Sequence, residues 1–310
     1  MLDSTTSSPT NNLALVRARA LCAAGRLAWF ELDLLKARTL IEESVALFRS
    51  AGDSLGLLNA LSSLMMVLSW QGEDELAQAR LQEGMHIVRG IEDRIKLLPV
   101  LSNFGWAAIF TSSPHALEDG WNLNKEVEAL AREANDKRGL AWALDGLGLC
   151  CYFRQEYEPS LAFLQESAAL FGELGELWAV AQIGFGLGNI AIEQERYDEA
   201  LIAIDESLSL LIQSKSWVGL PYTLEMYAYL AIAQKQPERA AHLLGATEKL
   251  RERTFSARQP LILALFERNM TALRALLPAE ELDAAWTQGR ALTSESAIAF
   301  ARSRKSTEEK

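Results

Sequence analysis

The side chains that could take part in catalysis are few and far apart along the chain. The 310 residues include three histidines, His86, His115 and His242. None of them stands in an HExxH pattern or in a recognisable arrangement of serine, histidine and aspartate. A metal site or a general base needs several such groups in one place. We therefore expect the histidines to be solvated or helix-end residues.

The three cysteines, Cys22, Cys150 and Cys151, have neither the spacing of zinc ligands nor that of a disulfide framework. Two adjacent positions of a helix point about 100° apart, so the pair at 150 and 151 favours packing over joint chemistry. Thiols used in this way are typical of a reducing compartment, and the sequence predicts a cytoplasmic protein.

One glutamate position recurs along the chain, and its members are Glu43, Glu83, Glu126, Glu166 and Glu206. An active site is one special place, so a recurring carboxylate indicates a structural or solvent-facing ridge. The chain also has no G-x-x-x-x-G-K-[ST] motif, so it carries no P-loop for a nucleotide. The sequence therefore predicts a protein that is not an enzyme and has no cofactor and no metal site.

The elements that would position any binding site are repeated pairs of helices. Apolar residues fall at helical spacing on both sides of short turns. Three positions of one unit return 40 residues later, as Gly148 on Gly188, Tyr157 on Tyr197 and Ser160 on Ala200. A glycine inside a helix costs about 1 kcal/mol against alanine, which indicates close helix approach. A period of this length is typical of a solenoid, because one unit cannot bury its apolar face alone.

We therefore predict an all-α fold, an α-α superhelix of about six 40-residue helical hairpins with a helical cap at the carboxyl end. Residues 1–12 are rich in Ser and Thr and are expected to be a disordered tail. The repeat array is predicted over 13–254 and the cap over 255–303, with a short tail at 304–310. The cap helices are expected at about 260–276, 279–291 and 293–303.

The third repeat is irregular. Gly105 keeps the 40-residue spacing from Met65, but the next small residue, Gly120, lies 43 residues after Ala77. Three residues are therefore inserted near Pro114, where we expect the first helix of that repeat to end.

The pattern resembles the tetratricopeptide repeat, whose two small residues and intervening aromatic residue stand here as Gly148, Ser160 and Tyr157. The period exceeds the usual length of about 34 residues, which implies longer helices. The whole of 13–301 is similar to the superhelical arm of large bacterial signal-transducing ATPases and LuxR-type regulators, including the maltotriose-responsive activator. The sharpest segments are ERAAHLLGATEKLRE at 238–252 and AAWTQGRALTSESAIAFA at 284–301.

This resemblance implies a concave binding surface lined by the first helix of each pair. Mapped residue by residue, that surface is rich in aromatic side chains with a few separated polar groups, as in a groove for a peptide or a small ligand. The predicted groove residues are Trp106, Trp142, Asp145, Phe185, Asn189, Tyr222, Glu225 and Tyr229, with Trp142 as the anchor. The alternative for the same side chains is packing within the core.

The net charge and the hydropathy of the chain restrict the kinds of partner that the sequence predicts. The formal net charge of −11 disfavours direct binding to nucleic acid or to an anionic membrane. No uninterrupted apolar span reaches about 18 residues, so no membrane helix is predicted. The expected partner is a protein or peptide, or a small-molecule effector.

Two functions fit these features. The first is a protein-interaction or ligand-sensing arm of a bacterial signalling or transcription regulator, which biases the state of an attached or separate ATPase. The alternative is a free-standing scaffold that assembles protein complexes. No helix-turn-helix follows Ala301, so we expect either the arm alone or a separate protein of the same type.

Overall fold

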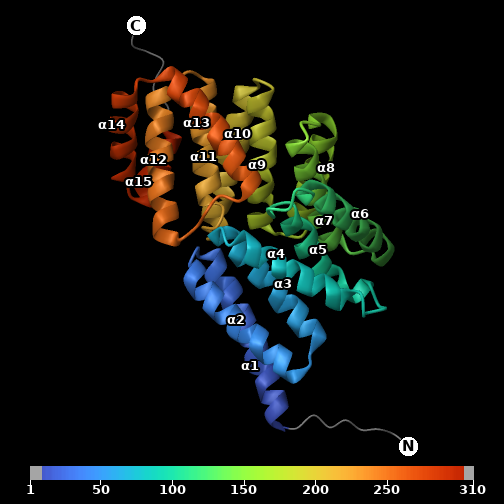
Figure 1. Ribbon diagram of the computed structural model, residues 1–310. Helices are drawn as coiled ribbons and strands as arrows, with labels where there is room; N and C mark the ends of the chain where they lie inside the picture. Colours follow the sequence, from blue (N-terminus) through green and yellow to red (C-terminus); the bar gives the residue numbers. More distant parts are fainter. Residues whose placement is uncertain (1–8, 304–310) are drawn as a thin grey trace, which may run out of the picture. The chain divides into compact units, whose positions relative to one another are not determined.

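The computed structural model describes residues 9–303, with side chains from residue 12 onward. Over these residues the fold is all-α, with no β-strand, so the predicted fold class is confirmed (Figure 1). Within this described range, twelve α-helices follow one another in pairs, and three more come after them. The pairs are α1 (Pro9–Phe30) and α2 (Leu34–Ala51), α3 (Ser54–Gln71) and α4 (Asp74–Val88), α5 (Leu98–Ala108) and α6 (Ala116–Ala134), α7 (Lys137–Phe153) and α8 (Tyr157–Glu173), α9 (Leu177–Glu193) and α10 (Tyr197–Ser214), and α11 (Leu220–Ala233) and α12 (Pro237–Thr254). A short 3-10 helix, η1 (Ile95–Leu97), precedes α5.

Most of the turns inside the pairs share one backbone conformation. A residue with positive φ ends the first helix at Leu32, Gly72, Gln155, Glu195 and Lys235. The amide of the next residue then returns to a carbonyl five positions back; Arg196 N, for example, donates to Ala191 O at 2.8 Å. This is the Schellman arrangement, which satisfies the last carbonyls of a helix and reverses the chain with few residues.

The third pair departs from this pattern where the sequence predicted an insertion. Helix α5 ends at Ala108, and the longer connection to α6 contains Pro114. The predicted close approach at small residues is also present. A Cβ atom added to Gly25 would lie 2.5 Å from Ile41 of the partner helix, and one added to Gly188 would lie 3.2 Å from Ile204.

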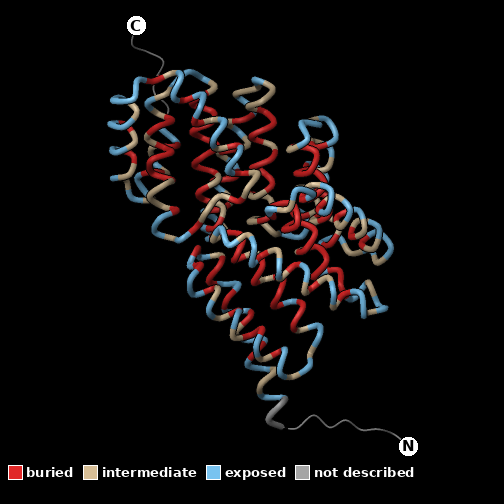
Figure 2. The backbone as a smooth tube through the Cα atoms, in the orientation of Figure 1, coloured by how far each residue is buried: buried red, intermediate tan, exposed pale blue. Residues whose placement is uncertain are grey.

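The described chain divides into two compact units, and the boundary falls within α7. The first unit holds residues up to Cys150 together with Ala257–Pro260. That late segment is tied to the first unit by its backbone, since Ala257 N donates to Trp70 O at 2.7 Å. Buried residues surround first helices such as α3 and α11 and follow one face of second helices such as α2 (Figure 2).

The second unit begins at Cys151 and ends with the three remaining helices, α13 (Pro260–Leu276), α14 (Ala279–Arg290) and α15 (Ser294–Arg302). Both α14 and α15 pack against α12, the second helix of the last pair. Two glycines allow α12 and α14 to touch through their backbones. A Cβ atom on Gly245 would lie 2.2 Å from Trp286 O, and one on Gly289 would lie 2.0 Å from His242 O.

The tail predicted over 1–12 differs from the structure at its end, because α1 already begins at Pro9. The earlier part of that tail and the predicted tail at 304–310 lie outside the described residues. Among the described residues, no helix combines the length and apolar character needed to cross a bilayer.

Candidate binding site

The eight predicted groove residues all lie on the first helices of their pairs, namely Trp106 on α5, Trp142 and Asp145 on α7, Phe185 and Asn189 on α9, and Tyr222, Glu225 and Tyr229 on α11. Six of them are buried, with at most 9% of their surface exposed. Trp142 and Tyr222 are partly exposed. Burial is what the packing alternative expects, whereas binding of a partner by these residues stays a prediction.

The first unit brings two of these residues into direct contact. The indole Nε1 of Trp106 donates a hydrogen bond of 2.9 Å to Oδ2 of Asp145. Burial raises the pKa of Asp145 to about 7, and the bond from Trp106 opposes that rise. Asp145 is thus an acid that changes charge near neutral pH inside the packed helices, where an uncompensated carboxylate is costly.

The second unit contains a buried ion pair that uses a predicted residue. Arg251 of α12 donates from Nε to one oxygen of Glu225 at 3.0 Å and from a terminal nitrogen to the other at 3.2 Å. The two side chains are 3% and 1% exposed. Burial by itself would lower the pKa of Arg251, but the carboxylate of Glu225 outweighs it and holds that pKa above its ordinary value.

A row of contacting aromatic rings begins at Arg251 of this ion pair. The guanidinium carbon of Arg251 lies 4.8 Å from the ring centre of Tyr222, in a cation–π contact. Tyr222 meets Phe185 edge to face with ring centres 5.9 Å apart, and Phe185 meets Tyr152 in the same way at 6.3 Å. The Asn189 amide donates to Phe185 O at 2.8 Å within its own helix. The structure therefore places Glu225 and Tyr222 directly on Arg251, and Phe185 contacts Tyr222 in turn.

Arg251 was missed by reasoning from the sequence, although a signal for it exists. Residues that meet across one helix pair are repeatedly 26 positions apart. Ser44 bonds to Ala18 O, and Ser207 bonds to Ala181 O. Glu225 and Arg251 have the same separation. A search for opposite charges at that register would have found the pair.

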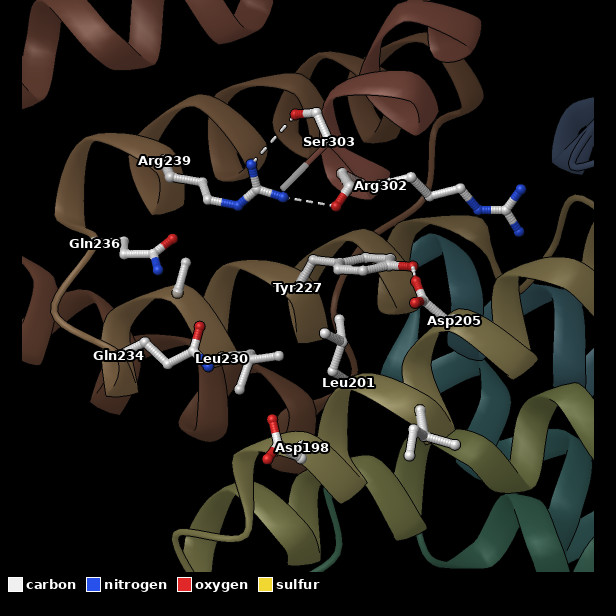
Figure 3. A pocket seen from close by; sticks show the side chains of 13 residues that line it. Asp198, Leu201, Asp205, Tyr227, Leu230, Gln234, Gln236, Arg239, Arg302 and Ser303 are labelled. Carbon is white, nitrogen blue, oxygen red and sulfur yellow. Dashed lines mark hydrogen bonds between the residues drawn. The ribbon is translucent and has the colours of Figure 1, made fainter. Parts of the chain in front are cut away.

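A pocket in the second unit was also missed. It has a volume of about 460 Å³ and is lined by residues of α10, α11, the start of α12 and the end of α15 (Figure 3). Its polar side chains include Asp198, Asp205, Tyr227 and Arg239. The predicted groove lies on the first helices of the pairs, whereas α10 is a second helix and α15 belongs to the cap.

The cysteines, histidines and recurring glutamates that were candidates for catalysis have packing or surface contacts in the structure. The three cysteines are buried and none of them forms a disulfide, as the packing interpretation expects. His242 bonds to Glu238 O and to Gln288, and His115 lies at the end of a helix. Three of the recurring glutamates are partly exposed and pair with arginines, as Glu43 with Arg17, Glu83 with Arg49 and Glu126 with Arg94. Within residues 9–303, no three His, Cys, Asp or Glu side chains are grouped to hold a metal ion.

Comparisons with known proteins give one similar solved structure and a partial sequence match. No protein-family model matches the chain. Putative HTH-type transcriptional regulators of Mycobacterium bovis and Mycobacterium tuberculosis are 36% identical over 83 residues. That match covers 27% of this chain and 9% of the length of each regulator. The crystal structure of aspartyl phosphate phosphatase F from Bacillus subtilis is similar with a TM-score of 0.59 and 14% identity, over 92% of this chain and 73% of that chain. The chain therefore has a tetratricopeptide-like helical repeat fold.

Proposed function

We propose that the chain is a protein-interaction or ligand-sensing arm of a bacterial signalling or transcription regulator, acting in the cytoplasm without catalysis of its own. The observation that carries this proposal is the similarity to HTH-type transcriptional regulators in a chain built from helical repeats. Repeat proteins of this kind present extended surfaces to their partners.

Among the predicted groove residues, an aromatic side chain that is partly exposed is the best candidate to contact a partner. Trp142 and Tyr222 meet both conditions among the predicted residues. Tyr222 rests on the guanidinium of Arg251, which is fixed in turn by Glu225. A ring held in this way loses little conformational entropy on binding, which is the property of an interface anchor.

Direct contact with DNA is not part of the proposal. The formal net charge of −11 opposes the phosphate backbone, and DNA affinity depends mainly on neutralising phosphates. In a complete regulator, DNA binding would belong to another module, and this arm would contribute the partner or the signal.

The experiment is affinity capture from the source bacterium with the chain as bait, followed by mass spectrometry. We expect a signal-transducing ATPase or a DNA-binding regulator as the specific partner. Trp142→Ala and Tyr222→Ala should each weaken capture about thirtyfold, as truncation of an interface anchor does. Trp286→Ala in α14 serves as the matched control.

All three variants are first checked for helix content by circular dichroism. Full capture by both Trp142→Ala and Tyr222→Ala would remove these rings from the interface. Specific capture of a complex with no regulator or ATPase would instead favour the free-standing scaffold.

A further inference from the structure

The pocket between α10, α11, α12 and α15 has the dimensions of a small-ligand site. Its volume of about 460 Å³ falls inside the range of roughly 300–1,000 Å³ that such sites occupy. All of its lining residues belong to the second unit. None of the interactions assigned above to partner binding uses it.

One side of the pocket presents a fixed cation. Arg239 of α12 donates to Ala301 O at 2.6 Å and to Ser303 Oγ at 3.5 Å, both in the last turn and end of α15. The ring of Phe300 lies 5.2 Å from the guanidinium carbon. A guanidinium has five N–H donors, so the donors left over from these two bonds form an oriented fork for a carboxylate.

The opposite side presents carboxylates. Asp198 of α10 is exposed and lies across the pocket from Arg239, with Leu201 and Leu230 between them (Figure 3). Asp205 lies further along the same helix and accepts a hydrogen bond from the hydroxyl of Tyr227. Burial, and then that bond to Asp205, raise the pKa of Tyr227, so the phenol stays neutral and remains a donor.

The charge balance selects the ligand class. Arg302 also lines the pocket, but its guanidinium points away from Arg239 and donates to Ser209 at 2.7 Å, so Arg239 is the cation beside Leu230 (Figure 3). One such cation beside two carboxylates disfavours phosphates and other multiply charged anions. The pocket presents a cation, then an apolar surface, then a carboxylate. It therefore matches a molecule that carries a carboxylate, an apolar chain and a cationic group in that order.

We propose that this pocket binds a small zwitterion whose carboxylate and ammonium groups are separated by an apolar chain. The carboxylate pairs with Arg239, the chain lies over Leu201 and Leu230, and the ammonium pairs with Asp198. Two sources share this chemistry, an ω-amino acid and a short peptide with free termini. Binding at this site is separate from the regulatory role proposed above.

The test measures binding of four probes to the full chain by isothermal titration calorimetry. The probes are ε-aminocaproate, glycyl-leucine, caproate, which lacks the ammonium group, and hexylamine, which lacks the carboxylate. At least one zwitterion should bind about tenfold more tightly than both single-charge probes, because a hydrogen bond to a charged group strengthens binding by about that factor. Preference for glycyl-leucine would identify a peptide as the source, and preference for ε-aminocaproate an ω-amino acid.

Variants assign the two ends. Arg239→Gln should weaken binding of the zwitterion and of caproate about tenfold and leave binding of hexylamine unchanged. Asp198→Asn should weaken binding of the zwitterion and of hexylamine about tenfold and leave binding of caproate unchanged. Arg274→Gln and Asp283→Asn, which remove the same charges from exposed positions outside the pocket, should bind as the unmodified chain does. Because Arg239 also holds α15, the exposed Asp198 provides the variant that leaves the fold intact.

The proposal is overturned if none of the four probes binds at millimolar concentration. It is also overturned if caproate binds as tightly as the zwitterions, since the carboxylate side would then take no ammonium group. Equal binding of a zwitterion by Asp198→Asn and the unmodified chain would lead to the same conclusion.

Discussion

The raised pKa of Asp145 makes the stability of the protein depend on pH. The change that isolates this effect is Asp145→Asn, which keeps an oxygen to accept the bond from the Trp106 indole and removes the titration. We expect the variant to gain stability relative to the unmodified chain as pH rises.

The magnitude follows from the two pKa values. The carboxyl titrates at an ordinary value of 3.8 and at about 7 in the folded chain. The folded state therefore holds the proton more tightly, and this contribution is complete below the lower value and is lost as pH rises through the higher one. At 1.36 kcal/mol for each pKa unit, the whole contribution is about 4 kcal/mol, and roughly 2 to 3 kcal/mol of it disappears between about pH 5 and pH 8.

The assay is urea denaturation of both proteins at several pH values in that window, followed by far-ultraviolet circular dichroism. The quantity of interest is the difference in unfolding free energy between Asp145→Asn and the unmodified chain. We expect it to grow by roughly 2 to 3 kcal/mol from about pH 5 to pH 8, because only the unmodified chain must bury a charge at the higher pH. Asp283→Asn, at an exposed site, is the control for a general change of charge.

A difference that does not change with pH would refute the reasoning. It would mean that Asp145 titrates at the same pH in the folded and unfolded chains. A difference that shrinks as pH rises would mean that the Trp106 bond outweighs burial and lowers the pKa.

Two further predictions concern the second unit. Gly289→Ala should destabilise the contact of α14 with α12 by about 3 kcal/mol, because the added methyl group meets the backbone of His242. Hydrogen exchange of the α14 amides measures this loss. Protection equal to that of the unmodified chain would show that the two helices separate enough to accept the methyl group without a loss of stability. The control is Gly172→Ala, where a Cβ meets nothing within 4 Å and stability should rise by a few tenths of a kcal/mol to about 1 kcal/mol. Glu225→Gln should lower the free energy of unfolding by about 3–5 kcal/mol, since it leaves the Arg251 charge buried without its counter-ion. A loss below about 1 kcal/mol on urea denaturation would show that Arg251 finds another partner or reaches water.

The sequence by itself determined the features that repeat. The 40-residue spacing, the small residues such as Gly25 and Gly188, the irregular third unit and the three terminal helices could all be predicted. Each depends on a local pattern, because helical periodicity and turn chemistry are written within a few neighbouring residues. The same reasoning placed the predicted groove residues on the first helices of the pairs.

Only the tertiary structure decided which of those side chains meet, and what covers them. Trp106 and Asp145 belong to different pairs, and nothing local signals their hydrogen bond or the burial that shifts the pKa of Asp145. The membership of Ala257–Pro260 in the first unit likewise rests on a backbone bond to a residue far away in the sequence. The pocket beside Arg239 exists because α15 returns to α12 and brings the carbonyl of Ala301 to that side chain. Such contacts depend on how whole helices pack, and helix packing is a property of the folded chain that no short stretch of sequence carries.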